Sequence, residues 1–359
     1  MVEAVKGFIN WISAPYYFVT LSILIVFAML RWKGWVKPRN FILIFTLFTV
    51  FFFVSCLDPD FLTIVVKADN LPIAGMLFLI IFFVWLALKQ AFENDARIRA
   101  GKGPSESEES KDKLLCWPHL VYTEFICLIL VTVVLLVWSI VVQAPIEQPA
   151  NLTDSPNPSK APWYFLGLQE MLVYYDPWIA GVLLPGYIIL GLMAIPYIDT
   201  NPKGNGYFTF AERRWEVGVF LFGFIVLWIV LIILGTFLRG PNWNFFGPYE
   251  YWDIHKVEPL VNIHLSDIIW VKLLNVGLPK NMYLREIFGI VAVLLYIFAL
   301  PLLLAKYGAK RFYDKMGPVR YHVMMNLFLV MMSLPIKMYL RWAFNFKYIV
   351  NLPEIFFNI

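Results

Sequence analysis

Residues 155–171, SPNPSKAPWYFLGLQEM, lie between two long apolar stretches of the chain. The segment has three prolines, two adjacent aromatic residues at 163 and 164, and a Gln–Glu pair at 169 and 170. Prolines stiffen a loop and favour the first turn of a following helix. The segment therefore places a Pro-rich loop, two aromatic rings and a carboxylate beside an apolar region. Their role depends on the rest of the chain.

The composition predicts an integral membrane protein. Of the 359 residues, 60% are hydrophobic and 15% are charged, whereas about a quarter of the residues in soluble domains are charged. We therefore expect membrane lipid to surround much of the surface. Nucleic acid is not an expected partner, because no basic run with interleaved aromatics occurs away from the apolar stretches.

A helix needs about 20 apolar residues to cross the hydrocarbon core of a bilayer. The shorter, interrupted stretch 162–176 predicts an interfacial helix instead. The expected fold is therefore all-α, with about eight transmembrane helices and one short helix on the positive (p) side of the membrane. The eight predicted spans are 14–31, 39–57, 72–91, 119–142, 178–198, 215–238, 287–305 and 321–342.

The distribution of Lys and Arg predicts the orientation of the spans. The links after the first, third, fifth and seventh predicted spans are rich in these residues, which favours the cytoplasmic side. Among the links on the opposite side, one has Lys67 as its single Lys or Arg residue, and another has Lys160 as its single one. We therefore expect both termini, the segment 155–171 and the loop 239–286 to lie on the p side.

The sequence gives no sign of a redox centre within this chain. His119 and His322 lie at the starts of predicted spans, and His255 and His264 lie in a loop. No CxxC or CxxCH motif occurs, so we expect no metal site. Charged residues are nearly absent from the spans, which argues against a pump or transporter. The exception, Lys337, is expected to extend outward to the interface.

The stretch KAPWYFLGLQEML at 160–172 follows a Pro-rich loop and has one predicted span before it and two after it. In this context it resembles the C-terminal part of cytochrome b and the subunit IV of cytochrome b6f-type (Rieske/cytochrome b) complexes. In that family a Pro-Glu-Trp-Tyr motif opens a short p-side helix. The resemblance is good over about 113–240 and extends to 305 at most, and residues 1–95 and the last span are additions to the family pattern.

This resemblance divides the chain into five expected regions. It also implies a location in the bacterial cytoplasmic (inner) membrane or another energy-transducing membrane. The regions are an N-terminal three-helix membrane extension (1–95), a polar cytoplasmic linker (96–117), a subunit IV-like domain (118–240), a p-side aromatic loop (241–286) and a C-terminal two-helix region (287–359).

In the family this segment lines the quinol-oxidising pocket, so the resemblance implies a quinol-binding role for Pro162, Trp163, Tyr164 and Leu166. Tyr164 is the residue expected to donate a hydrogen bond to a quinol oxygen. Alternatively, it is an ordinary aromatic residue of the membrane interface. The family carboxylate is missing, because Ala161 and Pro162 occupy the positions of Pro and Glu.

Glu170 is a candidate replacement for the missing carboxylate. Helical spacing places positions 163, 166, 170, 173 and 174 on one face. A carboxylate that is partly removed from water favours its neutral form, which suits a group that accepts a proton. The alternative is that Gln169 and Glu170 form the water-facing edge of an interfacial helix.

The resemblance implies a cofactor-free subunit of a quinol:cytochrome c-type oxidoreductase that forms part of a shared quinol site. Its b haems and iron–sulfur centre are expected on partners: a di-haem cytochrome b6-like subunit, a Rieske iron–sulfur protein and a c-type cytochrome. The family also implies a dimer of complexes. The alternative is a membrane scaffold subunit of a haem-protein complex with an inactive quinol site.

Overall fold

The computed structural model describes residues 2–67, 69–109, 114–142, 149, 151–153, 155–203 and 206–359. Within these residues the fold is almost entirely helical, as predicted, and seven helices are long and apolar enough to cross a membrane. These spans are Pro38–Ser55 (α3), Leu71–Arg99 (α5), Cys116–Val141 (η2 and α7), Ile179–Ile198 (η3 and α9), Arg214–Leu238 (α10, η4, α11 and η5), Ile287–Tyr307 (α13, η8 and α14) and Pro318–Phe344 (α16).

Several spans contain π-helical turns, so their component elements are short. Within the composite spans the bounds are η2 Cys116–Leu120, α7 Val121–Val141, η3 Ile179–Leu183, α9 Leu184–Ile198, α10 Arg214–Leu221, η4 Phe222–Ile229, α11 Val230–Ile233, η5 Leu234–Leu238, α13 Ile287–Leu294, η8 Leu295–Ala299 and α14 Leu300–Tyr307.

The remaining elements are short and mostly lie between the spans. They are α1 Val2–Ile12, α2 Pro15–Arg31, η1 Lys33–Val36, α4 Pro59–Val65, α6 Ser105–Glu109, α8 Trp163–Met171, η6 Pro241–Trp243, η7 Asp267–Leu273, α12 Met282–Arg285, α15 Lys310–Met316, η9 Pro353–Ile355, and the antiparallel pair β1 Asn351–Leu352 and β2 Phe357–Asn358.

The first predicted span corresponds to α2, which begins at Pro15. It meets α1 at a bend of 80°, and the two together count as an eighth candidate span. Proline suits the first position of a helix because its missing N–H would have no partner there. α1 is held by Lys6, whose amine lies 2.7 Å from the Asp58 carboxylate. Residues 2–12 were not predicted as a helix, and they are too few to cross a bilayer alone.

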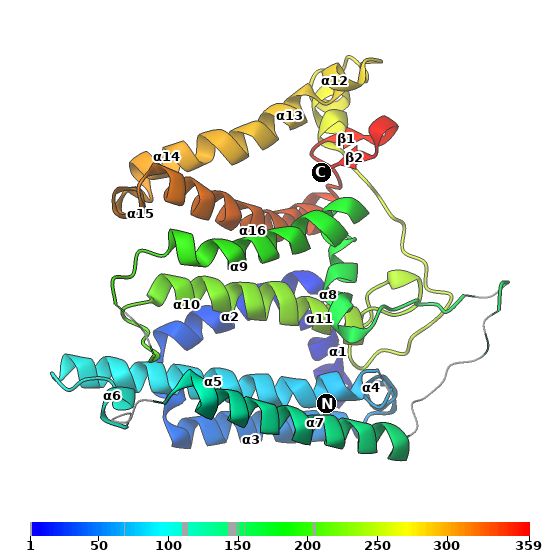
Figure 1. Cartoon of the computed structure of the whole chain (residues 1–359). Coiled ribbons are helices and arrows are strands. Elements are labelled where there is room, and N and C mark those ends of the chain that lie inside the picture. Colours follow the sequence, from blue (N-terminus) through cyan, green and yellow to red (C-terminus); the bar gives the residue numbers. More distant parts are fainter. Residues whose placement is uncertain are drawn as a thin grey trace.

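The long helices lie roughly parallel, and Figure 1 shows α8, α12, the two strands and both chain ends toward the same end of the bundle. The α2–α3 link, α6 and α15 lie toward the other end. This arrangement agrees with the predicted grouping of the termini and the segment 155–171 on one side. Which side of the membrane that is remains a prediction from the Lys and Arg pattern.

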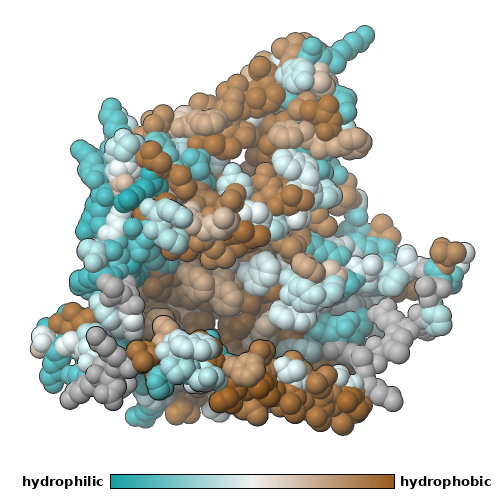
Figure 2. Space-filling view, viewed as in Figure 1, coloured by the Kyte–Doolittle hydropathy of each residue, from teal (hydrophilic) through white to brown (hydrophobic). Residues whose placement is uncertain are grey.

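The main core is formed by α2, α5, α8, α9, α16 and the span Arg214–Leu238. No residue of α7 is buried among the described parts of the chain, so its apolar side chains are largely open to lipid or to another protein. Figure 2 shows apolar residues over the outer helices at the upper and lower edges of the molecule, with hydrophilic residues gathered at the α6–α15 end.

The helix α5 continues to Arg99, eight residues beyond the predicted span, because polar contacts hold its end. Buried Asp95 accepts hydrogen bonds from the backbone N–H groups of Phe210 and Ala211. Buried Asn94 donates to the Glu106 carboxylate at 2.8 Å. The start of the predicted linker 96–117 is therefore part of a helix, and α6 packs against it. Residues 110–113 of that linker lie outside the described residues.

Lys337 does not extend outward as predicted. Its side chain is 2% exposed, and its amine donates a 2.5 Å hydrogen bond to the Lys347 carbonyl. The ammonium also lies 5.4 Å from the centre of the Tyr175 ring, an arrangement in which the ring face attracts the cation. The segment after α16 folds back over this lysine, which a count of apolar residues could not reveal.

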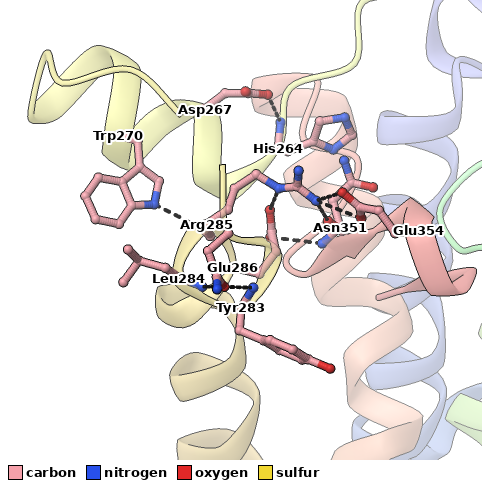
Figure 3. A network of polar contacts seen from close by, with 10 residues as sticks. His264, Asp267, Trp270, Tyr283, Leu284, Arg285, Glu286, Asn351 and Glu354 are labelled. Carbon is pink, nitrogen blue, oxygen red and sulfur yellow. Dashed lines mark hydrogen bonds and ion pairs between the residues drawn. The ribbon is translucent and has the colours of Figure 1, made fainter. Parts of the chain in front are cut away.

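The C-terminal strands are attached to the start of the span Ile287–Tyr307 by the polar network in Figure 3. Arg285 contacts Glu286 at 3.2 Å and Glu354 at 3.0 Å. The buried Glu286 carboxylate accepts a 2.9 Å hydrogen bond from the backbone N–H of Asn351. One turn further along α13, Gly289 allows close approach, because a Cβ there would collide with the Ile349 carbonyl.

Substitution of Gly289 by Ala is expected to separate the C-terminal segment from α13. Overpacking of a close contact costs roughly 1–3 kcal/mol. We expect a lower midpoint of thermal unfolding in detergent and faster cleavage of residues 345–359 by protease. The matched control is Gly186→Ala in α9, where no atom lies within 4 Å of the added carbon. Equal stability and equal cleavage in the two variants would contradict this packing.

Candidate functional site

The helix α8 is shorter than predicted, and its start is fixed by its own sequence. Pro162 is the last extended residue before it, with φ −52° and ψ 146°. The Gln169 side chain reaches back to the preceding loop, where it accepts a 2.8 Å hydrogen bond from Ala161 N–H and donates one of 2.8 Å to the Ser159 carbonyl. The helix ends at Met171 rather than at residue 176.

Glu170 lies on the buried face of α8, where its side chain is fully buried and surrounded by hydrogen-bond donors. The Arg239 guanidinium forms a bidentate pair with this carboxylate, with Nη2 2.7 Å from Oε1 and Nε 3.0 Å from Oε2. The Trp243 indole N–H donates to Oε2 at 3.1 Å, and the Tyr174 hydroxyl donates to Oε1 at 3.2 Å. A two-bond Arg–carboxylate pair is among the strongest polar contacts in proteins.

This ion pair ties α8 to the end of the span Arg214–Leu238. Arg239 directly follows that span and also donates to the Trp243 carbonyl at 3.1 Å. Close packing supports the same contact: a Cβ on Gly235 would lie 3.1 Å from the Leu166 carbonyl oxygen, so only glycine fits without displacement. α8 is therefore a packed element with one exposed face and not a helix lying free at the interface.

The structure divides the predicted site residues between the two faces of α8. Leu166 and Glu170 point into the core, together with Tyr174 from the following turn. Trp163 is partly buried, whereas the Tyr164 ring is 45% exposed and turns away from the core. The alternative in which Glu170 faces water is wrong, because its side chain is 0% exposed.

Both oxygens of Glu170 already accept hydrogen bonds, from Arg239, Trp243 and Tyr174. Proton acceptance would compete with the guanidinium fork and the indole N–H. The sequence analysis missed Arg239 and Trp243 as its partners. A signal was available, since Arg239 is the first charged residue after an apolar span.

Lys160 lies in the loop immediately before α8, and its side chain folds onto the end of the span Arg214–Leu238. Its amine donates a 2.8 Å hydrogen bond to the Thr236 carbonyl and lies 4.7 Å from the centre of the Trp252 ring. Burial lowers the pKa of Lys160 to about 7. The positive charge of Lys67 lowers this pKa further, and the negative charge of Glu170 opposes the shift.

The described residues contain no group of three or more His, Cys, Asp or Glu side chains that could hold a metal ion. His119 and His322 lie within the first turns of their spans, and His255 and His264 lie in the loop before α12. No histidine is therefore at the centre of a span, where two ligands for a membrane haem would be needed.

The Glu170–Arg239 pair is expected to dominate the stability of this region. Arg239→Leu leaves a buried carboxylate without its main partner, which costs about 3–5 kcal/mol. We expect a large fall in the midpoint of thermal unfolding in detergent, and partial recovery when Glu170→Leu is added.

The control is Arg213→Leu, which removes a solvent-accessible pair with Asp199 and is expected to cost about 0–1 kcal/mol. Similar midpoints for the two arginine variants would contradict the role assigned to the buried pair.

Comparison with known proteins places this geometry in a family context. Residues 149–250 match the family model described as cytochrome b (C-terminal)/b6/petD. The match begins after the span Cys116–Val141, later than the predicted start near residue 113, and ends at residue 250, between the predicted limits of 240 and 305. No solved structure matches the chain.

The menaquinol:cytochrome c reductase cytochrome c subunit of Bacillus subtilis (strain 168) is 30% identical over 141 residues. The alignment covers 36% of this chain and 53% of that protein, so the chain spans about half the length of this curated relative. Residues 149–250, which hold α8, Arg239 and the two spans between them, are therefore the part of this longer chain that is similar to the C-terminal part of cytochrome b.

Proposed function

We propose that this chain is a membrane subunit of a quinol:cytochrome c-type oxidoreductase and that α8 forms part of the wall of its quinol-oxidising site. The observation that carries the proposal is the match of residues 149–250 to the cytochrome b C-terminal family. The geometry supports it, because the matched segment contains a short helix that is rigidly attached on one face and presents aromatic rings on the other. The name of the curated relative favours a hydroquinone as the substrate.

The b haems and the iron–sulfur centre are proposed to belong to partner subunits. Oxidation of a hydroquinone releases two electrons, which one acceptor on the p side and one within the membrane would take up. The histidines of this chain lie outside the centres of its spans, so a di-haem cytochrome b6-like subunit would supply the membrane acceptor. A Rieske protein and a c-type cytochrome would complete the path on the p side.

α7 is the proposed contact for the di-haem subunit. It precedes α8 in the chain, and none of its residues is buried by the other described segments. An apolar helix without a partner in its own chain can be covered by another membrane subunit without the loss of internal contacts. Such a subunit would face α7 on one side and the exposed rings of α8 on the other.

The residues of this chain would shape the pocket and exclude water. We propose that Glu170 acts as a positioning residue, in place of the proton-accepting role predicted from sequence, because its two oxygens hold Arg239. Tyr164 is the proposed hydrogen-bond donor to a quinol oxygen. Pro162 and Trp163 would line the quinol site at the start of α8, and Leu166 would support them from the buried face of the helix.

Tyr164→Phe is expected to slow quinol oxidation by roughly tenfold, since one lost hydrogen bond of about 1.4 kcal/mol corresponds to that factor. The measurement is oxidation of a short-chain hydroquinone by the detergent-purified complex, with a c-type cytochrome as acceptor. Tyr197→Phe is the matched control, because Tyr197 is 77% exposed at the opposite end of α9 from α8.

A complex that contains all its haems but does not oxidise hydroquinone would overturn the proposal. That result would favour the scaffold role, for which the missing family carboxylate at Ala161–Pro162 is the main argument.

A further inference from the structure

We propose that the amine of Lys160 accepts a proton from the bound hydroquinone, the role for which this chain lacks the family carboxylate. This inference rests on the proposed function and adds a catalytic residue to it. Lys160 is two residues before the cap of α8 and three before Trp163. It therefore lies at the end of the helix where the missing carboxylate would be.

The Lys160 amine is placed so that it can exchange a proton with a ligand and with solvent. One of its donors bonds the Thr236 carbonyl at 2.8 Å, and its charge faces the Trp252 ring. An ammonium group has three donors, so two are left for a ligand or water. The side chain is partly exposed, which leaves a route for the proton to the solvent.

Two unpaired buried groups border the same place. The Thr236 hydroxyl and the Trp252 indole N–H have no hydrogen-bond partner within the part of the chain that the structure describes. Buried polar groups are nearly always paired in native proteins. Both groups belong to residues that Lys160 contacts through other atoms, namely the Thr236 carbonyl and the face of the Trp252 ring. Unpaired polar atoms on these two residues support the proposal of a polar ligand near the amine.

The charges around Lys160 favour its neutral form. Lys67, from the loop before α5, and Arg239, at the end of η5, both repel an ammonium. Glu170 on α8 attracts it, but the Arg239 fork neutralises that carboxylate. With burial, these charges lower the pKa of Lys160 to about 7. A lysine that is partly neutral near pH 7 can act as a general base.

The proposed step balances as follows. The hydroquinone loses two electrons, one to the iron–sulfur centre and one to the b haem of the partner subunits. An O–H bond breaks, and the neutral Lys160 amine takes that proton to form an ammonium. The ammonium then releases the proton to water on the p side, which restores the base, and the second proton of the hydroquinone passes to water.

The test compares Lys160→Arg with the wild-type complex over a range of pH. Arginine keeps the positive charge, the hydrogen bond to Thr236 and the stacking on Trp252, but it has no neutral form in this range. A structural role would therefore survive the change. We expect about a 100-fold loss of quinol oxidation at pH 7, within the usual contribution of a general base. Lys37→Arg at an exposed site is the matched control.

The pH profile separates base catalysis from packing. The active form is the neutral amine, so the wild-type rate should rise with pH and reach half its maximum near pH 7. Lys67→Gln removes a like charge, which raises the pKa of Lys160 and moves this half-maximum to higher pH. A purely structural lysine would produce neither the rise nor its displacement.

A second readout does not depend on activity. In the purified complex with ¹³C-dimethylated lysines, the signal that disappears in Lys160→Arg should titrate near pH 7, far below the ordinary lysine value of about 10.4. Two results would overturn the role of Lys160 while leaving the proposed function intact. One is a Lys160→Arg complex with the same activity and pH profile as the wild-type complex, and the other is titration of the Lys160 signal near pH 10. Absence of quinol oxidation in the wild-type complex would overturn the proposed function, and this inference with it.

Discussion

The ion pair between Glu170 and Arg239 is the contact on which the rest of the candidate site depends. It joins α8 to the end of the span Arg214–Leu238, and it is almost completely buried, with Glu170 0% and Arg239 9% exposed. A buried charge pair is costly to form and more costly to break, so it fixes the helix in one position. The exposed rings of α8, the loop that carries Lys160 and the turn at Trp243 are all positioned relative to that contact.

Much of the fold follows from the length of the apolar stretches. The last predicted span, 321–342, corresponds to Pro318–Phe344, because a run of apolar residues with a proline at its start defines a helix locally. The pairing of Glu170 with Arg239 was not predictable in the same way. These residues are 69 positions apart, and only the packing of α8 against the span brings them together. The sequence indicated the helix and its helical face, but not that Glu170 on this face binds Arg239.

Lys337 shows the same limit of local reasoning. A lysine near the end of a span ordinarily extends toward water, but here the segment after α16 folds back and supplies a carbonyl and aromatic rings to the ammonium. In the sequence Lys160 is an isolated charge in a link poor in Lys and Arg and the first residue of the stretch that resembles the family motif. Its relation to Thr236 and Trp252 appears once the loop after Arg239 is folded against the loop before α8. In both cases a contact distant in sequence determines what the charge does.

The central claim is that this chain is the cofactor-free part of a cytochrome b-type assembly. The most direct test is a dithionite-reduced minus oxidised absorption spectrum, recorded on the chain purified with its partners in mild detergent and on the chain alone. The account predicts a b-type haem signal in the assembly and none in the isolated chain. Absence of haem from every assembly that contains the chain would contradict the account.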